Sequence, residues 1–176
     1  MEKSLGRAFI VSLLILMVFS FLFYIIGYSM LGILDHAFTR VTDHPSHFVL
    51  WITYPFTRLP WEWITEITEV ITADGIKVMY TGFIVSFVLA AIIAGFFGGD
   101  FSNSLGGWLL TSLVCIVLLI AVAFIDSYNI DWICNGYLCA LDYTVVKILV
   151  VGLINLLIFG GITLLTVLVI GDYDKK

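Results

Sequence analysis

The sequence predicts an all-α integral membrane protein: a four-transmembrane-helix bundle with an extracytoplasmic amphipathic helix in the first loop. Hydrophobic residues make up 61% of the 176 residues and charged residues only 12%, whereas a soluble domain carries about 25% charged residues. Four apolar stretches are long enough to cross a hydrocarbon core of about 30 Å, which takes about 20 helical residues. Because backbone groups in lipid must bond within their own segment, these stretches are expected to be helices. Residues 1–176 then form a single membrane domain.

The four spans are expected at approximately 8–34, 76–97, 107–125 and 144–170. Lys3 and Arg7 precede the first span, as in a signal peptide. Its apolar run is far longer than the 7–15 residues of a signal peptide, so we interpret it as a retained anchor. No Asp, Glu, Lys, Arg or His lies in the middle of a predicted span, which disfavours a proton-coupled transporter.

Charge predicts the orientation of the bundle. Four spans place both termini on one side and the loops 35–75 and 126–143 on the other. Each side has four basic residues, but the terminal side has far fewer aqueous residues, so its basic density is higher. The positive-inside bias therefore predicts cytoplasmic termini and outward loops in the cell membrane. The formal charge of −5 falls on the loop side.

The second loop contains two of the three cysteines, Cys134 and Cys139, separated by the turn signal Asn135-Gly136. Outside the cytoplasm such a pair favours a structural disulfide. Redox chemistry, metal binding and free thiols are the alternatives, although the C-x4-C spacing differs from the C-x2-C of redox and zinc sites. Cys115, in the third span, is expected to be a packing residue.

The first loop contains every histidine of the chain. His36, Asp43, His44 and His47 could supply ligands to a divalent metal, the only cofactor that the sequence suggests. Because polar residues of a membrane protein gather in its loops, ordinary solvated histidines are the alternative interpretation.

Two further segments of this loop are apolar. Residues 47–56 are too short to span and should lie in the interface or re-enter the membrane. Residues 60–73 predict an amphipathic helix with Pro60 in its first turn, which either lies flat or caps the bundle. Its acidic stripe is Glu62, Glu66 and Glu69. The stripe is interpreted as a solvated face, or as a contact for a cation or a basic partner.

Small residues predict where helices pack closely. The second span has two rows with a spacing of four, formed by Ala90, Ala94 and Gly98 and by Ala91, Gly95 and Gly99. The fourth span offers a similar surface with Gly152, Asn155, Gly160 and Gly161. These surfaces could serve helices of the same chain or of another chain.

The layout of a long first outer loop, a short inner turn and inward termini resembles the topology of claudin-type junction proteins. The first outer loop lacks the cysteine pair of claudins, so the resemblance covers topology only. The favoured function is a non-catalytic membrane subunit that packs with other transmembrane chains, or with copies of itself, in a larger complex. A homo-oligomeric pore with an acidic vestibule and a metal-dependent membrane enzyme are the alternatives. The sparse basic residues give no indication of nucleic-acid binding.

Overall fold

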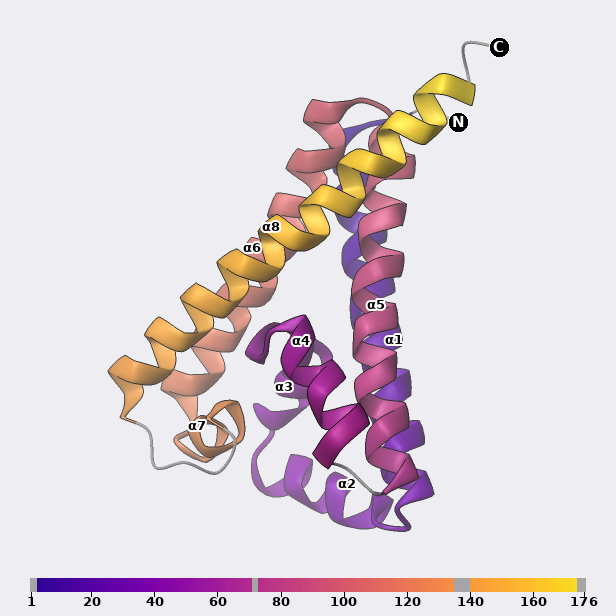
Figure 1. Cartoon of the computed structure of the whole chain (residues 1–176). Coiled ribbons are helices and arrows are strands. Elements are labelled where there is room, and N and C mark those ends of the chain that lie inside the picture. The colour runs from indigo at the N-terminus through magenta and orange to yellow at the C-terminus, as the bar shows by residue number, and fades with distance from the viewer. Residues whose placement is uncertain (1–2, 71–72, 135–139, 174–176) are drawn as a thin grey trace.

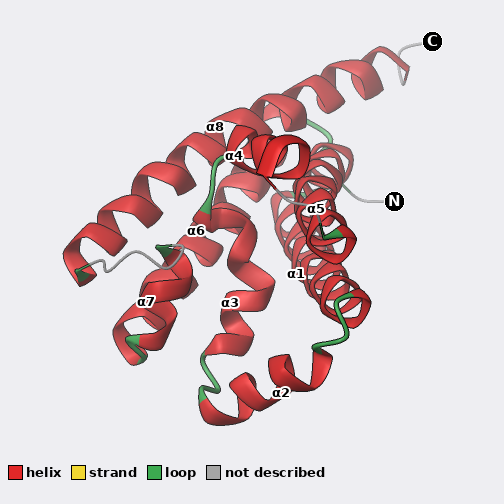
Figure 2. Cartoon of the chain, turned by 60° about the horizontal axis from the view of Figure 1, so that its bottom comes forward, coloured by secondary structure: helices red, strands yellow, loops and turns green. Residues whose placement is uncertain are grey.

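The computed structural model describes residues 3–70, 73–134 and 140–173, and all regular structure in these ranges is helical (Figure 2). Four helices are long and apolar enough to cross a membrane, which confirms the predicted set of spans. They are α1 (Leu5–Met30), α5 (Asp74–Gly98), α6 (Phe101–Ile125) and α8 (Leu141–Tyr173).

Capping residues and glycines move the helix ends away from the predicted boundaries. Asp100 accepts a hydrogen bond from the backbone N–H of Asn103 at 2.8 Å and starts α6. The segment 98–106, predicted as a turn, is therefore mostly the first part of α6. Gly99 links α5 to it with a φ of 79°. Gly32, with a φ of 68°, lies in the turn after α1, which ends earlier than predicted.

The spans form two pairs, α1 with α5 and α6 with α8 (Figure 1). The pairs converge near the N- and C-termini, here called the terminal end, and diverge toward the other end, here called the loop end (Figure 1). Within the first pair, a Cβ added to Gly27 would lie 2.6 Å from the carbonyl oxygen of Gly75. Only glycine allows such close contact of the two backbones.

The two pairs touch where α6 packs on α1 and α5 and where α5 crosses α8. A Cβ on Gly95 would lie 2.7 Å from the carbonyl oxygen of Thr163. The hydroxyl of Thr163 donates to the carbonyl of Ala91 at 3.1 Å. Small residues therefore close the bundle on the terminal side.

The first loop fills the space between the pairs at the loop end. It forms α2 (Leu34–Asp43), α3 (His47–Thr53), the 3-10 turn η1 (Tyr54–Thr57), α4 (Pro60–Thr65) and the π-helical turn η2 (Glu66–Val70). Residues 47–65, here called the wedge, enter between the helix pairs (Figures 1 and 2). Residues 47–56, expected in the membrane interface or as a re-entrant segment, lie within the bundle, where Leu50, Trp51 and Phe56 are buried.

Aromatic contacts show how deep the wedge lies. The ring of Phe56 packs on Phe87 with centroids 4.7 Å apart, and Phe87 stacks on Phe159 at 4.5 Å. Phe87 is roughly 20 Å along α5 from its first residue, at 1.5 Å per residue. The tip of the wedge is thus part of the hydrophobic core of the spans.

The segment 60–73, predicted as one amphipathic helix, has the short helix α4 followed by the π-helical turn η2 in its described part. Its helical backbone changes winding at Glu66, and residues 71–72 lie outside the described part. Trp63 is fully buried against Phe83 and Phe87, whereas Trp61 and Ile64 are half exposed. Because Trp63 inserts between the spans, its apolar neighbours on α4 point away from the core.

Among the described residues between α6 and α8, Tyr128–Ile133 form the short helix α7. It lies at the loop end, below the α6–α8 pair in Figure 1. The first loop touches α7 through His47, and it also packs on α1, α5, α6 and α8.

Candidate functional site

A buried ion pair holds the end of the wedge. The guanidinium of Arg58, only 4% exposed, binds the carboxylate of Glu66. Its Cζ lies 5.2 Å from the centre of the Tyr80 ring, and Asn155 of α8 donates from Nδ2 to the carbonyl of Arg58 at 2.9 Å. Arg58 therefore joins the wedge to both helix pairs.

The glutamates of the predicted acidic stripe make separate contacts. Glu66 is the partner of Arg58, while Glu62 accepts from the backbone N–H of Leu59 at 2.7 Å and caps α4. The side chain of Glu69 lies outside the described part of the structure.

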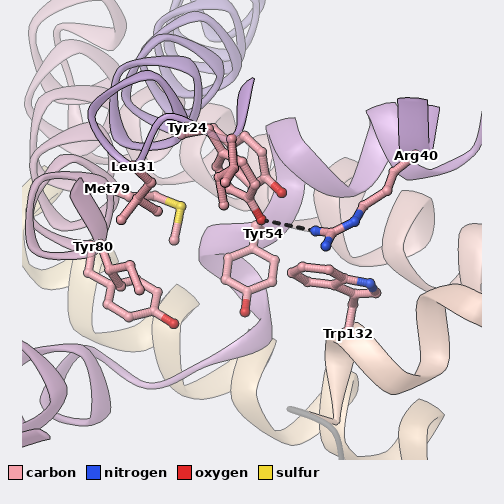
Figure 3. Close-up of a pocket in the computed structure, with 10 residues that line it drawn as sticks. Tyr24, Leu31, Arg40, Tyr54, Met79, Tyr80 and Trp132 are labelled. Atoms are coloured by element: carbon pink, nitrogen blue, oxygen red, sulfur yellow. Dashed lines mark hydrogen bonds between the residues drawn. The ribbon is translucent and has the colours of Figure 1, made fainter. Parts of the chain in front are cut away.

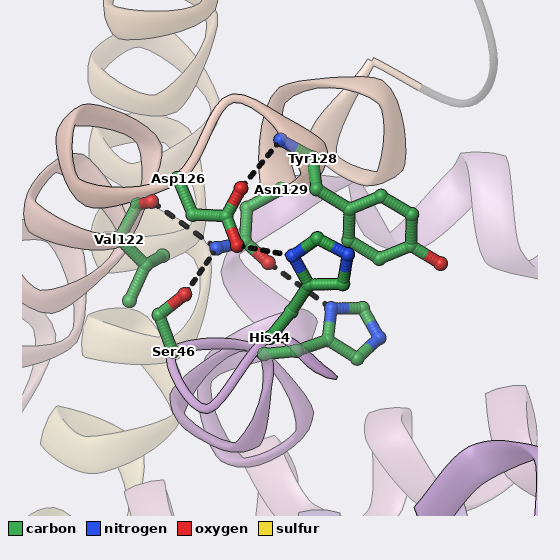
Figure 4. Close-up of polar contacts among 7 residues, drawn as sticks. His44, Ser46, Val122, Asp126, Tyr128 and Asn129 are labelled. Atoms are coloured by element: carbon green, nitrogen blue, oxygen red, sulfur yellow. Dashed lines mark hydrogen bonds and ion pairs between the residues drawn. The ribbon is translucent and has the colours of Figure 1, made fainter. Parts of the chain in front are cut away.

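Two histidines join the start of the wedge to the second loop (Figure 4). Nδ1 of His44 is 2.6 Å from Oδ2 of Asp126, and the His44 ring stacks on Tyr128 at 4.0 Å. His47, fully buried, places Nδ1 3.0 Å from Oδ1 of Asn129. These three contacts, here called the histidine clasp, connect residues 44–47 with the α6–α7 junction.

The clasp is completed by backbone and hydroxyl contacts and shifts two pKa values. Asn129 donates from Nδ2 to the carbonyl of Val122 at 3.2 Å and to Ser46 Oγ at 2.9 Å. Burial lowers the pKa of His47 below its ordinary value, against the hydrogen bond to Asn129. Partial desolvation raises the pKa of Asp126, but hydrogen bonds from the Tyr128 N–H and from His44 outweigh it and lower the pKa.

The four predicted metal ligands do not gather at one site in the described structure. Among the described residues, no three His, Cys, Asp or Glu side chains are arranged to hold a metal ion. His36 and Asp43 are exposed on α2, whereas His44 and His47 take part in the clasp. The geometry therefore adds no support to the metal prediction, and gives two of its four residues another role.

A cavity of about 460 Å³ lies at the loop end, beside the clasp (Figure 3). Its walls are mostly apolar and aromatic, with one guanidinium, that of Arg40. Arg40 donates from Nη1 to the hydroxyl of Tyr28 at 3.5 Å, and its Cζ lies 5.0 Å from the centre of the Trp132 ring. The lining residues come from α1, the turn after it, α2, η1, α5 and α7: Tyr24, Tyr28, Leu31, Ile33, Arg40, Tyr54, Ile76, Met79, Tyr80 and Trp132.

The small residues of α5 that were predicted to pack against another helix contact other parts of the same chain. Ala90, Ala91 and Ala94 are fully buried. A Cβ on Gly95 would meet α8, on Gly98 it would meet Ser104, and on Gly99 it would meet the side chain of Lys3. Of the two uses expected for these rows, the structure shows packing within one chain.

In α8, three of the four small or polar residues also point inward. Gly152 faces Ile116, Gly160 approaches Leu105 and Trp108, and Asn155 binds the wedge. Gly161 differs, because a Cβ built there has no described atom within 4 Å outside its own helix turn and chain neighbours. One turn before and after it, Leu157 and Leu165 are 71% and 61% exposed. Gly161 is thus the floor of an outward notch between two large side chains.

Two of the three cysteines lie in the described part of the structure, and both are buried. Cys115 is fully buried in α6, as expected of a packing residue. Cys134 is buried, with Sγ 3.4 Å from Thr144 Oγ1. Cys139 lies outside the described residues, so the disulfide stays a prediction.

Sequence reasoning missed the residues that hold the wedge and line the cavity: Arg40, Arg58, Asp126, Asn129 and the tyrosines. Arg58 follows directly after a short apolar segment that was expected either to re-enter the membrane or to lie in its interface. A re-entrant segment would carry it to membrane depth, and a partner such as Glu66 could have been sought on that ground. No comparable signal in the sequence pairs His44 with Asp126, which lie in different loops.

No protein-family model, no curated protein and no solved structure matches the chain.

Proposed function

We propose that the chain is a non-catalytic, multi-pass subunit of a larger membrane complex, and that it packs against another transmembrane chain through the outward face of α8. The observation that carries the proposal is the notch at Gly161, flanked by the exposed side chains of Leu157 and Leu165. A small residue between large ones accepts a side chain of a neighbouring helix and lets the two backbones approach.

The other small residues support this assignment by contrast. Gly95, Gly98, Gly152 and Gly160 each meet a neighbour from their own chain. Gly161 has the same chemistry but no such neighbour among the described residues. The partner is either a different transmembrane chain or a second copy of this one.

Orientation is part of the same proposal. The higher density of Lys and Arg near the termini favours cytoplasmic termini, with the cavity and the clasp on the outer face of the cell membrane. Single cysteines introduced at exposed Ser102 and Ser127 would test this. A membrane-impermeant thiol reagent added to intact cells should label position 127 and leave position 102 unlabelled; the reverse pattern contradicts the orientation.

Site-specific photo-crosslinking in the native membrane tests the interface. A photoreactive amino acid at Leu157 should give a protein adduct of defined mass, whereas the same group at Leu14 of α1, which is 54% exposed, should react with lipid only. The mass and peptide content of the adduct distinguish a different chain from a second copy. The substitution Gly161→Leu fills the notch and should abolish the adduct, since no described atom prevents the larger side chain from being placed there. Lipid adducts alone at Leu157 would refute the interface.

A further inference from the structure

The cavity at the loop end has the composition of a small-molecule site. Its volume of about 460 Å³ falls in the range of ligand pockets, roughly 300–1,000 Å³, which are mainly apolar with few polar groups. Its walls come from segments far apart in the sequence, from Tyr24 to Trp132, so the fold assembles it only when the wedge is in place (Figure 3).

The positive charge of Arg40 indicates the charge of a ligand that would fit the cavity. Its guanidinium has five N–H donors, and among the described residues it makes one hydrogen bond, to Tyr28 at the long distance of 3.5 Å, besides its contact with the Trp132 ring. Within the described part of the chain no carboxylate pairs with Arg40. The cavity therefore presents a cation with unused donors, which suits a carboxylate or a phosphate.

The remaining walls of the cavity are aliphatic and aromatic, and they indicate the chemistry of the rest of the ligand. Leu31, Ile76 and Met79 supply aliphatic surface, and Tyr24 and Tyr28 stack with centroids 4.5 Å apart to form a flat aromatic side. Figure 3 shows Leu31 and Met79 across the cavity from Arg40 and Trp132. A ligand that satisfies both walls has an anionic head and an apolar body.

The position of the cavity matches such a ligand. Tyr28 is near the end of α1 and Ile76 is in the first turn of α5, so the cavity lies where the spans leave the hydrocarbon. Amphiphiles place the boundary between head and tail at this level. We propose that the cavity binds an anionic amphiphile, with its head on Arg40 and its apolar body against Leu31, Ile76 and Met79.

Two sources share this chemistry: the head group of an anionic bilayer lipid and a free amphiphilic anion. The site goes beyond the proposed interface at Gly161, because it lies at the loop end on other helices. The Gly161→Leu variant should keep it, so failure of one proposal leaves the other untouched.

Tryptophan quenching by a brominated probe tests the site in the full-length protein in nanodiscs. 12-Bromododecanoate should quench fluorescence saturably, and Trp132→Phe should remove the saturable component because Trp132 lines the cavity. Arg40→Gln should weaken binding about tenfold or more, the effect of losing a charge-assisted hydrogen bond. The matched control Arg7→Gln, at the terminal end, should bind as the unmodified protein does.

A second probe, 12-bromododecanol, has the same apolar chain without the negative charge, so it tests the role of charge in the unmodified protein. The neutral probe should bind the unmodified protein at least about tenfold more weakly; equal binding of both probes, or unchanged binding by Arg40→Gln, overturns the proposal. Nanodisc composition identifies the source. If phosphatidylglycerol in the nanodisc weakens binding of the bromododecanoate probe, phosphatidylcholine does not, and Arg40→Gln removes this competition, the site binds a lipid head group. If the probe binds with equal affinity in phosphatidylglycerol and phosphatidylcholine nanodiscs, the site binds a free anion.

Discussion

Asn155, in the middle of α8, donates a hydrogen bond from Nδ2 to the backbone carbonyl of Arg58, with 2.9 Å between the two atoms. The contact joins residues 97 positions apart in the sequence and satisfies a carbonyl group that lies deep among the spans. A buried carbonyl without a partner costs roughly 1–3 kcal/mol. Asn155 therefore serves to hold the wedge and is not available as polar contact for a second chain.

Removing this hydrogen bond should release the tip of the wedge. We expect Asn155→Ala to lower the free energy of unfolding by about 2 kcal/mol, because the Arg58 carbonyl stays buried without its donor. Leu153→Ala, which truncates an exposed side chain on the same helix, is the control and should change it by less than about 1 kcal/mol. Reversible unfolding in mixed micelles measures both; equal effects would show that the hydrogen bond is unimportant.

The ion pair between Arg58 and Glu66 gives a second prediction. Glu66→Gln removes the carboxylate that binds the buried guanidinium of Arg58 and should destabilise the protein by about 3 kcal/mol. Glu62→Gln changes a carboxylate on the same helical segment that is exposed, and it should cost less than about 1 kcal/mol. A similar loss for both variants, measured by the same unfolding assay, would argue against a special role of the pair.

The histidine clasp should make stability depend on pH. Since burial lowers the pKa of His47, the folded state binds fewer protons than the unfolded state between that pKa and the ordinary value of about 6.5. The stabilisation that neutral, buried His47 contributes is complete above about pH 6.5 and is lost as the pH falls toward the lowered pKa. Nearby Arg40 and His44 act in the same direction as burial, and Asp126 opposes it.

Thermal unfolding at pH 7.5 and 5.5 measures this dependence. The unmodified protein should melt at a lower temperature at pH 5.5, and His47→Gln should show a smaller difference. His36→Gln, at an exposed site, should behave like the unmodified protein. The lowered pKa of Asp126 acts in a separate window, below about pH 4. An unchanged pH difference in His47→Gln would contradict the assignment.

Two glycines separate packing within the chain from packing between chains. Gly95→Leu drives a side chain into the backbone of Thr163 and should destabilise the fold by about 2 kcal/mol or more. Gly161→Leu has open space and should leave the unfolding free energy within about 0.5 kcal/mol. A large loss in Gly161→Leu would mean that the notch is filled in the folded chain.

The disulfide between Cys134 and Cys139 is a prediction from sequence. Intact-mass analysis under non-reducing conditions should find two fewer hydrogens than in the reduced chain. Cys139→Ser should lower stability by about 2 kcal/mol. Alkylation of all three cysteines in the unreduced, unfolded protein would refute the bridge.

The sequence predicts the spans well because lipid imposes one simple requirement, a long apolar helix with internal hydrogen bonds. Of the small residues singled out in the sequence, Ala91 is buried and Gly95 lies against the backbone of α8. The wedge is harder to predict, since its position depends on contacts such as Phe56 with Phe87 that join distant segments. Arg58 and Glu66 look like ordinary loop charges until their burial is known. The cavity depends on the same long-range assembly and has no sequence motif.

The central claim, membership of a larger membrane complex, is tested most directly by the native mass of the chain extracted from its own membrane in mild detergent, with every component identified. The account predicts a complex of defined stoichiometry in which this 19.7 kDa chain accompanies other transmembrane chains or copies of itself, and which Gly161→Leu disrupts. A closed ring of identical chains would support self-assembly and make conductance the next measurement. A monomer of 19.7 kDa with bound lipid alone would contradict the account.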